Sequence, residues 1–423
     1  MPAASYRAFQ HPAFVRYQVG RVCGIVAMQV LSVAVGWQVY SLTGKALDLG
    51  WVGLVQFLPL ALFWPITGVI VDRSDRRLVI VGTYVWQVAM ALVLAAIAWW
   101  PGEDGGGIGP ILTVLFLIAT GRALAAPAAS ALLPQLVPRG DFANAATWSS
   151  TLSSVASIVG PALGGAVYAW AGGASAAYIV SAVLLALGGS QLARVPLTVE
   201  RGSAGAMSWG AAIAGVRFIF ATPVLLGAIT LDLFAVLLGG SVALLPIVAR
   251  DILHTGPDGL GLLRAAPAVG AALVAFFLAF RPVTRRIGIV LFAAVTVFGL
   301  ATITFGLATS FGVALAALIV VGASDEVSVF IRQNVVTLAT PNALRGRVSA
   351  AEFVFIGASN ELGEMESGMA AAWLGVVTAI VFGGVGTIGV VVVTAIFARS
   401  LRRIDRFEEL TPDTEHPGGN RAH

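Results

Sequence analysis

The sequence has 423 residues, of which 58% are hydrophobic and only 11% are charged, and its mean hydropathy is +0.91. A soluble domain carries roughly a quarter charged residues, so this composition excludes a water-soluble fold, which could not cover so much apolar surface. The single cysteine, Cys23, excludes a disulfide framework and a cysteine metal site.

Apolar runs long enough to cross a hydrocarbon core of about 30 Å, which takes roughly 20 helical residues, recur from Phe14 to Ala398. They predict an all-α integral membrane protein, because a closed barrel would show short alternating strands instead. We place twelve transmembrane helices at residues 15–40, 49–71, 78–100, 108–130, 143–169, 174–193, 223–249, 259–280, 287–306, 310–333, 347–371 and 374–397.

The basic residues predict the orientation, because they concentrate in the cytoplasmic loops of membrane proteins. With a cytoplasmic N-terminus, only Lys45 and Arg250 of the 25 basic residues fall in outside loops. Four arginines fall within spans, and the remaining ones lie in cytoplasmic segments. Both termini are therefore predicted to be cytoplasmic, and the net charge of +4 reflects topology and does not indicate a nucleic-acid partner.

A polar stretch at residues 194–208 divides the chain into two predicted six-helix bundles, at residues 1–193 and 223–398. Residues 194–222 form the predicted cytoplasmic linker, and residues 399–423 form a cytoplasmic tail. Within the linker, Trp209 to Ala221 has the spacing of an interfacial helix, or it extends the seventh span.

The two halves are similar to each other in sequence. At an offset of 203 residues, Gly160, Pro161 and Gly165 align with Gly363, Glu364 and Gly368. Repeated halves with binding residues near the midplane, at the interface between the halves, are a recurrent transporter architecture. The functional site is therefore expected between the two bundles.

The loop after the second span contains Gly68, Asp72, Arg73, Arg76 and Arg77 and resembles the signature loop of the major facilitator superfamily. A carboxylate beside several guanidinium groups can bridge to a helix of the other half and stabilise one conformation, because such charge-assisted pairs are strong. A basic loop that only sets the topology is the alternative. The equivalent loop of the second half, at residues 281–286, lacks the glycine and the aspartate.

Two further segments carry a resemblance within this superfamily. Gly160, Pro161, Gly164 and Gly165 in the fifth span are similar to a motif of its antiporters, which implies export, although ordinary helix packing is an even alternative. Residues 332–350 and 355–368 resemble the enterobactin exporter branch. This resemblance implies proton-driven export of a siderophore of the enterobactin type, with multidrug or macrolide efflux as the alternative.

Charges inside the spans are functional candidates, because they are costly to bury in a membrane. The carboxylates are Asp232, Asp325, Glu326, Glu352, Glu361 and Glu364, and the cations are Arg21, Arg122, Arg264 and Arg332. A conformational change that alters their pairing could load and release a proton. We expect Asp232 and Glu361 to be the leading proton or substrate groups.

Three of these candidates have more specific expectations. Arg122 is the favoured cation, because it stands where antiporters of this superfamily often carry an arginine in the fourth span. Glu352 and Arg332 lie nearer the cytoplasmic ends of their spans and are expected at a gate or an interface. For each carboxylate taken alone, a structural ion pair is an equal alternative.

Enzyme chemistry has no support in the sequence. The four histidines lie at or outside the span ends, and neither a metalloprotease, a serine hydrolase nor an ATP-binding motif occurs. We therefore expect a transporter without cofactor or metal, which uses a proton gradient and binds a small molecule and protons. The family resemblance implies a monomer, and we expect a multi-pass protein of the bacterial cytoplasmic membrane.

Overall fold

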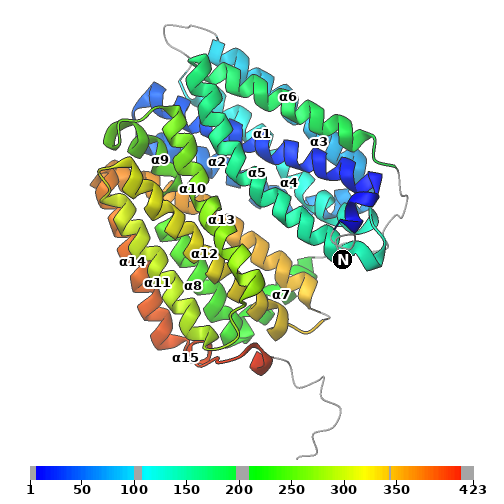
Figure 1. Ribbon diagram of the computed structural model, residues 1–423, viewed down its shortest axis with the longest axis vertical. Helices are drawn as coiled ribbons and strands as arrows, with labels where there is room; N and C mark the ends of the chain where they lie inside the picture. The colour runs from blue at the N-terminus through cyan, green and yellow to red at the C-terminus, as the bar shows by residue number, and fades with distance from the viewer. Residues whose placement is uncertain (1–5, 100–106, 197–208, 343, 411–423) are drawn as a thin grey trace, which may run out of the picture.

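The computed structural model describes residues 6–99, 107–196, 209–342 and 344–410, and these residues form helices joined by short connections, with no strand among them (Figure 1). Each of the twelve predicted spans falls on a helical segment. The all-α membrane fold predicted from the sequence is therefore confirmed. The predicted tail beyond residue 410 and residues 197–208 of the linker lie outside the described residues.

The first six long helices lie together in one part of the molecule (Figure 1). In this group α1 packs on α5 and α6, α3 packs on α4 and α6, and α2 packs on α4. The bounds are α1 Pro12–Thr43, α2 Ala46–Arg73, α3 Arg76–Trp99, α4 Gly109–Leu132, α5 Phe142–Ala171 and α6 Ala174–Ala193. Their core is apolar, and its buried Tyr178 donates a hydrogen bond to Gln38 Oε1 at 2.6 Å.

The remaining long helices form a second group, in which α10 packs on α12, α11 packs on α12 and α14, and α8 packs on α13 and α14. The bounds are α8 Pro223–Gly239, α10 Pro257–Phe280, α11 Ile287–Gly306, α12 Phe311–Ala339, α13 Arg345–Leu374 and α14 Val376–Phe397, followed by the short α15 Arg399–Arg402. The exact bundle boundaries stay a prediction. Residues Trp209–Ala221 form α7, which packs on α13, and its place at a membrane surface also stays a prediction.

The seventh predicted span, residues 223–249, is not one regular helix. After Gly239 the chain continues as a 3₁₀ turn at Ser241–Leu244, one helical turn at Leu245–Ile247 (α9) and a π-helical turn at Val248–Ile252. Gly239, Gly240 and Pro246 explain the break, because glycine and proline weaken a regular helix. The Ser367 hydroxyl donates to the freed carbonyl of Gly240 at 2.9 Å.

The outer faces of the helices are apolar. Trp170 and Trp373 are 91% and 85% exposed, and many Leu, Val and Phe side chains point outward in the same way. Ten helices are long and apolar enough to cross a membrane within the described residues, and Gly109–Ala125 is a shorter apolar helix. The remaining helix, α13, carries six charged residues. Because charged residues are rare in spans, those of α13 indicate a functional role for this helix.

The two groups of helices meet at close crossings that depend on glycine. Where α5 crosses α10, a Cβ atom on Gly165 would lie 2.3 Å from the Pro257 carbonyl oxygen. Where α2 crosses α13, a Cβ atom on Gly368 would lie 2.9 Å from Cα of Gly50. Small residues let helix backbones approach this closely in membranes. These crossings connect the two groups at the end of the molecule that contains Lys45 and Gly256.

Candidate functional site

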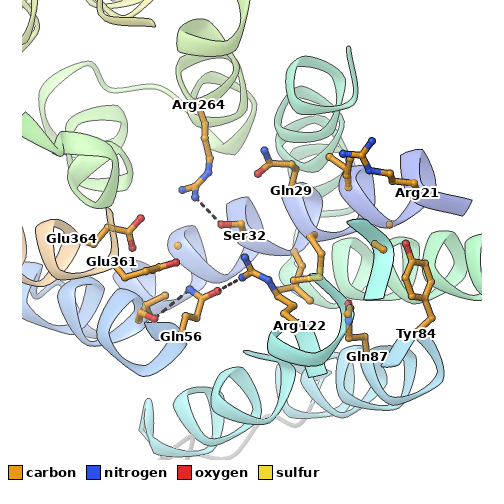
Figure 2. Close-up of a pocket in the computed structure, with 18 of the residues that line it drawn as sticks. Arg21, Gln29, Ser32, Gln56, Tyr84, Gln87, Arg122, Arg264, Glu361 and Glu364 are labelled. Atoms are coloured by element: carbon orange, nitrogen blue, oxygen red, sulfur yellow. Dashed lines mark hydrogen bonds between the residues drawn. The ribbon is translucent and has the colours of Figure 1, made fainter. Parts of the chain in front are cut away.

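A cavity of about 470 Å³ lies between the two groups of helices, with walls from α1, α2, α3, α4, α6, α10 and α13 and from the irregular segment after α8. Its polar lining consists of Tyr17, Arg21, Gln29, Ser32, Gln56, Tyr84, Gln87, Arg122, Arg264, Glu361 and Glu364 (Figure 2). Met28, Leu31, Leu49 and Val52 supply apolar wall between them. A few polar groups on a mainly apolar wall are typical of small-molecule sites.

Two carboxylates and two guanidinium groups share one end of this cavity. Glu361 and Glu364, one helical turn apart on α13, face Arg264 of α10 and Arg122 of α4 (Figure 2). Within the described residues, no ion pair within 4.0 Å joins them. Both carboxylates are therefore available to a ligand or a proton.

Neutral polar groups hold the two arginines instead. Arg264 Nη2 donates to Ser32 Oγ at 2.7 Å, and Arg122 Nη1 donates to Gln56 Oε1 at 3.2 Å. The Gln56 amide in turn donates to the Val52 carbonyl oxygen at 3.2 Å. Each guanidinium has five N–H donors, so most of the donors remain for a bound molecule.

Arg21 occupies the other end of the cavity, near Tyr84, Gln87 and Gln29 (Figure 2). Its guanidinium donates to the hydroxyl and the carbonyl oxygen of Ser149 on α5. A second cavity of about 750 Å³ continues from this point, because Tyr17, Arg21 and Ala129 line both. On α5 its wall consists of Ala146 and five serines, Ser149, Ser150, Ser153, Ser154 and Ser157.

The glycines of the predicted antiporter motif lie on both faces of α5. Gly160 and Gly164 pack against Gln29 and Val30 of α1, and Gly165 packs on α10. The aligned positions of the second half behave in the same way, since Gly363 packs on α8 and Gly368 packs on α2. The internal symmetry read from the sequence therefore corresponds to equivalent helix crossings.

A second cluster of charges lies away from the cavity, inside the second group of helices. Arg332 of α12 contacts Asp232 of α8 (Nε to Oδ1, 3.3 Å) and Glu352 of α13 (Nη1 to Oε1, 2.8 Å). These three residues are 3%, 8% and 9% exposed. Asp325 is near Asp232, and both line a small separate cavity.

The structure therefore divides the charged residues predicted from the sequence between two places. Glu361, Glu364, Arg21, Arg122 and Arg264 line the central cavity. Asp232, Asp325, Arg332 and Glu352 lie in the second cluster. The two leading carboxylates, Asp232 and Glu361, are thus not neighbours, and the half-buried Glu326 on α12 does not line either of these cavities.

Only part of the predicted signature loop is described, because the surroundings of Gly68 and the side chains of Asp72 and Arg73 are outside what the structure describes. Arg77 donates to the carbonyl oxygens of Ala193 and Val195, at the end of α6 in its own half. The Asp75 carboxylate accepts from the Arg77 backbone N–H at 2.9 Å. Arg76, at the start of α3, also has interaction partners. The bridge to the other half stays a prediction.

Sequence reasoning missed the neutral members of the site, above all Gln29, Gln56 and Gln87. A signal was present, since each is an amide inside an apolar span of the first half. Such a side chain needs a hydrogen-bond partner in a membrane and therefore faces the protein interior.

Comparison with known proteins places this chain in a family. The model of the family described as "transmembrane secretion effector" matches residues 3–418. The chain belongs to this family of the major facilitator superfamily. The enterobactin exporter branch is not specifically supported by these comparisons.

Three curated relatives have the same name, macrolide efflux protein A. The protein from Streptococcus pyogenes is 30% identical over 183 residues, which are 43% of this chain and 44% of that protein. The protein from Enterococcus faecalis is 34% identical over 125 residues, which are 30% of this chain and 38% of the relative. The match therefore spans less than half the length of these relatives.

Solved structures show the same fold over nearly the whole chain. A bacterial homologue of the human lysosomal transporter Spinster, in an inward-facing and occupied conformation, gives a TM-score of 0.71 at 15% identity, covering 97% of this chain and 99% of that one. A POT family transporter in complex with 5-aminolevulinic acid gives 0.72 at 11% identity, with 92% and 96% covered. At these identities the likeness concerns the fold alone.

Proposed function

We propose that this protein is a proton-coupled efflux transporter, which exports small molecules across the bacterial cytoplasmic membrane by alternating access. The observation that carries this proposal is the charged cavity between the two helix groups, which is lined by side chains from both groups. The family and the fold relatives are transporters, which supports a role other than an enzyme. The named relatives support the direction of efflux.

The arginine distribution supports an orientation with both termini in the cytoplasm, as argued from the sequence. In this orientation the helix crossings at Gly165 and Gly368 lie toward the outside. The serine-lined cavity next to Arg21 then leads toward the cytoplasm. The described conformation fits a state that receives substrate from inside the cell, and the protein acts as a monomer in this proposal.

A macrolide or a similar amphipathic amine is the first candidate substrate. It is supported by the names of the relatives and by Glu361 and Glu364 at one end of the cavity, which form no ion pair with any residue that the structure describes. A carboxylate in a partly apolar cavity favours a cationic ligand group.

A siderophore of the enterobactin type is the second candidate. The observation that favours it is the presence of Arg21, Arg122 and Arg264 on the cavity wall. Guanidinium groups bind anionic oxygens and stack on aromatic rings, and a catecholate offers both. The two candidates differ in the charge that they bring to the cavity, and this difference allows a direct test.

Transport into inside-out vesicles tests the proposal. Vesicles with an acidic interior are given radiolabelled erythromycin in one arm and iron-free enterobactin in the other, with and without the proton gradient. We expect gradient-dependent uptake of one probe, retained in the control Glu366→Gln. Erythromycin uptake should be reduced in Glu361→Gln, and enterobactin uptake should be reduced in Arg264→Gln. Glu366 is on the same helix as Glu361 and does not line the cavity. Equal uptake with and without the gradient would refute proton coupling. If neither probe is taken up, both substrate proposals are refuted.

A further inference from the structure

The second charged cluster has a composition that the central cavity does not explain. Asp232, Asp325 and Glu352 are three acids, and Arg332 is the single base that contacts or approaches all of them. The helices packed against α8 do not supply a second buried base: α11 and α14 contain no charged residue. Arg217 of α7 and Arg399 and Arg402 of α15 are exposed. The cluster therefore has more acid than base.

Burial makes this imbalance important. Asp232 is 8% exposed and Arg332 is 3% exposed, and both lie within a group of helices whose buried core is otherwise mainly apolar. A buried charge without a counter-charge is strongly unfavourable, so a group in this position is neutralised by a cation or by a proton. One positive charge, that of Arg332, does not neutralise three carboxylates.

The contacts of Asp232 show a carboxylate that is held weakly. Its only contact with a charged group is the 3.3 Å approach of Arg332 Nε, and no hydrogen bond to it is found within the described residues. The buried Arg332 Nε likewise has no hydrogen-bond partner, whereas Nη1 donates to Glu352 at 2.8 Å. Arg332 thus binds Glu352 more closely and leaves Asp232 incompletely satisfied.

A small space lies beside this carboxylate. Asp232, Ser324, Asp325 and Ser328 line a cavity of about 10 Å³, with Ala235, Val236, Val295 and Phe298 as its apolar wall. This volume is close to the lower limit for one water molecule. Both carboxylates face this space, which is too small for a substrate molecule.

We propose that Asp232 and Asp325 form a proton-binding site that is separate from the central substrate cavity, with Arg332 and Glu352 as its positioning residues. The proton forms an O–H bond with a carboxylate oxygen of the pair, and Arg332 keeps its ion pair with Glu352. The inference rests on the proposed proton-coupled efflux and assigns the proton to a different place from the substrate.

The separation matters for coupling. Asp232, Asp325 and Glu352 stand on three different helices, α8, α12 and α13, and α13 also carries Glu361 and Glu364 into the central cavity. Protonation changes the attraction between α8, α12 and α13, so it changes how these helices pack. A movement of α13 then reaches the substrate groups without competition between proton and substrate for one carboxylate.

Infrared difference spectroscopy of the purified protein tests the site without any transport. The carbonyl stretch of a protonated carboxyl group, recognised by its shift in D₂O, is recorded as pH is raised from acidic to alkaline. We expect this band in the unmodified protein, and we expect its amplitude to fall at least by half in Asp232→Asn and in Asp325→Asn. Glu361→Gln and the control Glu366→Gln should retain the band. The Asp325→Asn variant keeps the test valid if Asp232→Asn does not fold.

Binding and exchange separate this inference from the proposed function. Radiolabelled erythromycin or enterobactin should bind Asp232→Asn within about threefold of the unmodified protein. In vesicles that contain Asp232→Asn, exchange of labelled for unlabelled probe should continue, whereas uptake driven by the proton gradient should be lost. Three results would overturn the proposal. The band could be unchanged in both aspartate variants, it could be lost only in Glu361→Gln, or sodium ions could remove it at constant pH. Absence of transport in the unmodified protein would refute the function and leave the spectroscopic result intact.

Discussion

Gly165 of α5 and Gly261 of α10 are in direct contact, so that a Cβ atom on Gly261 would lie 3.1 Å from Cα of Gly165 and 2.5 Å from the Pro161 carbonyl oxygen. The residues belong to different helix groups, and neither position accommodates a larger side chain without a shift of backbone. The contact is therefore specific to the conformation in which this end of the molecule is closed.

Gly261→Val should weaken this closed conformation. Overpacking costs about 1–3 kcal/mol, which corresponds to roughly 5- to 150-fold in the conformational equilibrium. We expect maleimide to label Leu253→Cys, at the closed end, on the order of 10-fold faster when Gly261→Val is present. The background is Cys23→Ser, which removes the single native cysteine. Gly389→Ala is the control, because no atom lies within 4 Å of an added Cβ there; equal labelling rates in both variants would contradict the expectation.

Tyr40 should stabilise the same end. Its hydroxyl donates to the Asp251 carboxylate, and Arg250 lies 5.7 Å above its ring, so α1 is joined to the segment after α8. A hydrogen bond to a charged group contributes about 1.5–3 kcal/mol. Tyr40→Phe removes the hydroxyl and keeps the ring, and should also increase labelling of Leu253→Cys by roughly 10- to 100-fold. If the rate rises only in Tyr40→Ala, ring packing and not the hydrogen bond holds this end closed.

Glu361 and Arg264 should affect the two candidate substrates in opposite ways. Loss of a charge-assisted hydrogen bond of about 1.5–3 kcal/mol weakens binding by roughly 10- to 100-fold. Glu361→Gln is therefore expected to weaken erythromycin binding and to leave enterobactin binding unchanged or tighter, and Arg264→Gln is expected to do the reverse. Equilibrium binding of the labelled probes to purified protein measures both. An equal loss for both probes in both variants would show that charge does not decide the choice of substrate.

Arg332 should be more important for stability than any other single charged residue in the described part of the second helix group. Arg332→Met leaves Asp232 and Glu352 buried without their base, and breaking such a pair costs about 3–5 kcal/mol. The triple variant Arg332→Met, Asp232→Asn, Glu352→Gln removes the uncompensated charges and should recover most of the loss. Thermal unfolding followed by tryptophan fluorescence compares the two. A triple variant as unstable as the single one would mean that packing of the Arg332 side chain, and not charge, is what matters.

Hydropathy was sufficient to predict most of the helices, because a span that faces lipid has to be largely apolar. The exception is α13, which carries six charged residues. Hydropathy did not show that the seventh span loses its regular structure after Gly239. The residues that indicate this break are Gly239, Gly240 and Pro246. They lie within a long apolar run, and hydropathy alone does not distinguish them from the rest of the span. The serine that satisfies the Gly240 carbonyl, Ser367, is 127 residues away and cannot be recognised from the sequence.

The charges inside the spans were predictable as a set, but their partners were not. Asp232 and Glu361 look equivalent in sequence, as single acids inside apolar helices. The direction in which each side chain points decides between a buried ion pair and the wall of the cavity, and that direction depends on packing between helices far apart in the chain. The same holds for Arg122, whose partner Gln56 lies on another helix.

The irregular segment after α8 contributes Ala243 and Pro246 to the wall of the central cavity. Backbone without regular helical hydrogen bonds is tolerated at membrane depth where it lines such a space. The break at Gly239 and Gly240 therefore determines the shape of one cavity wall as well as the end of α8.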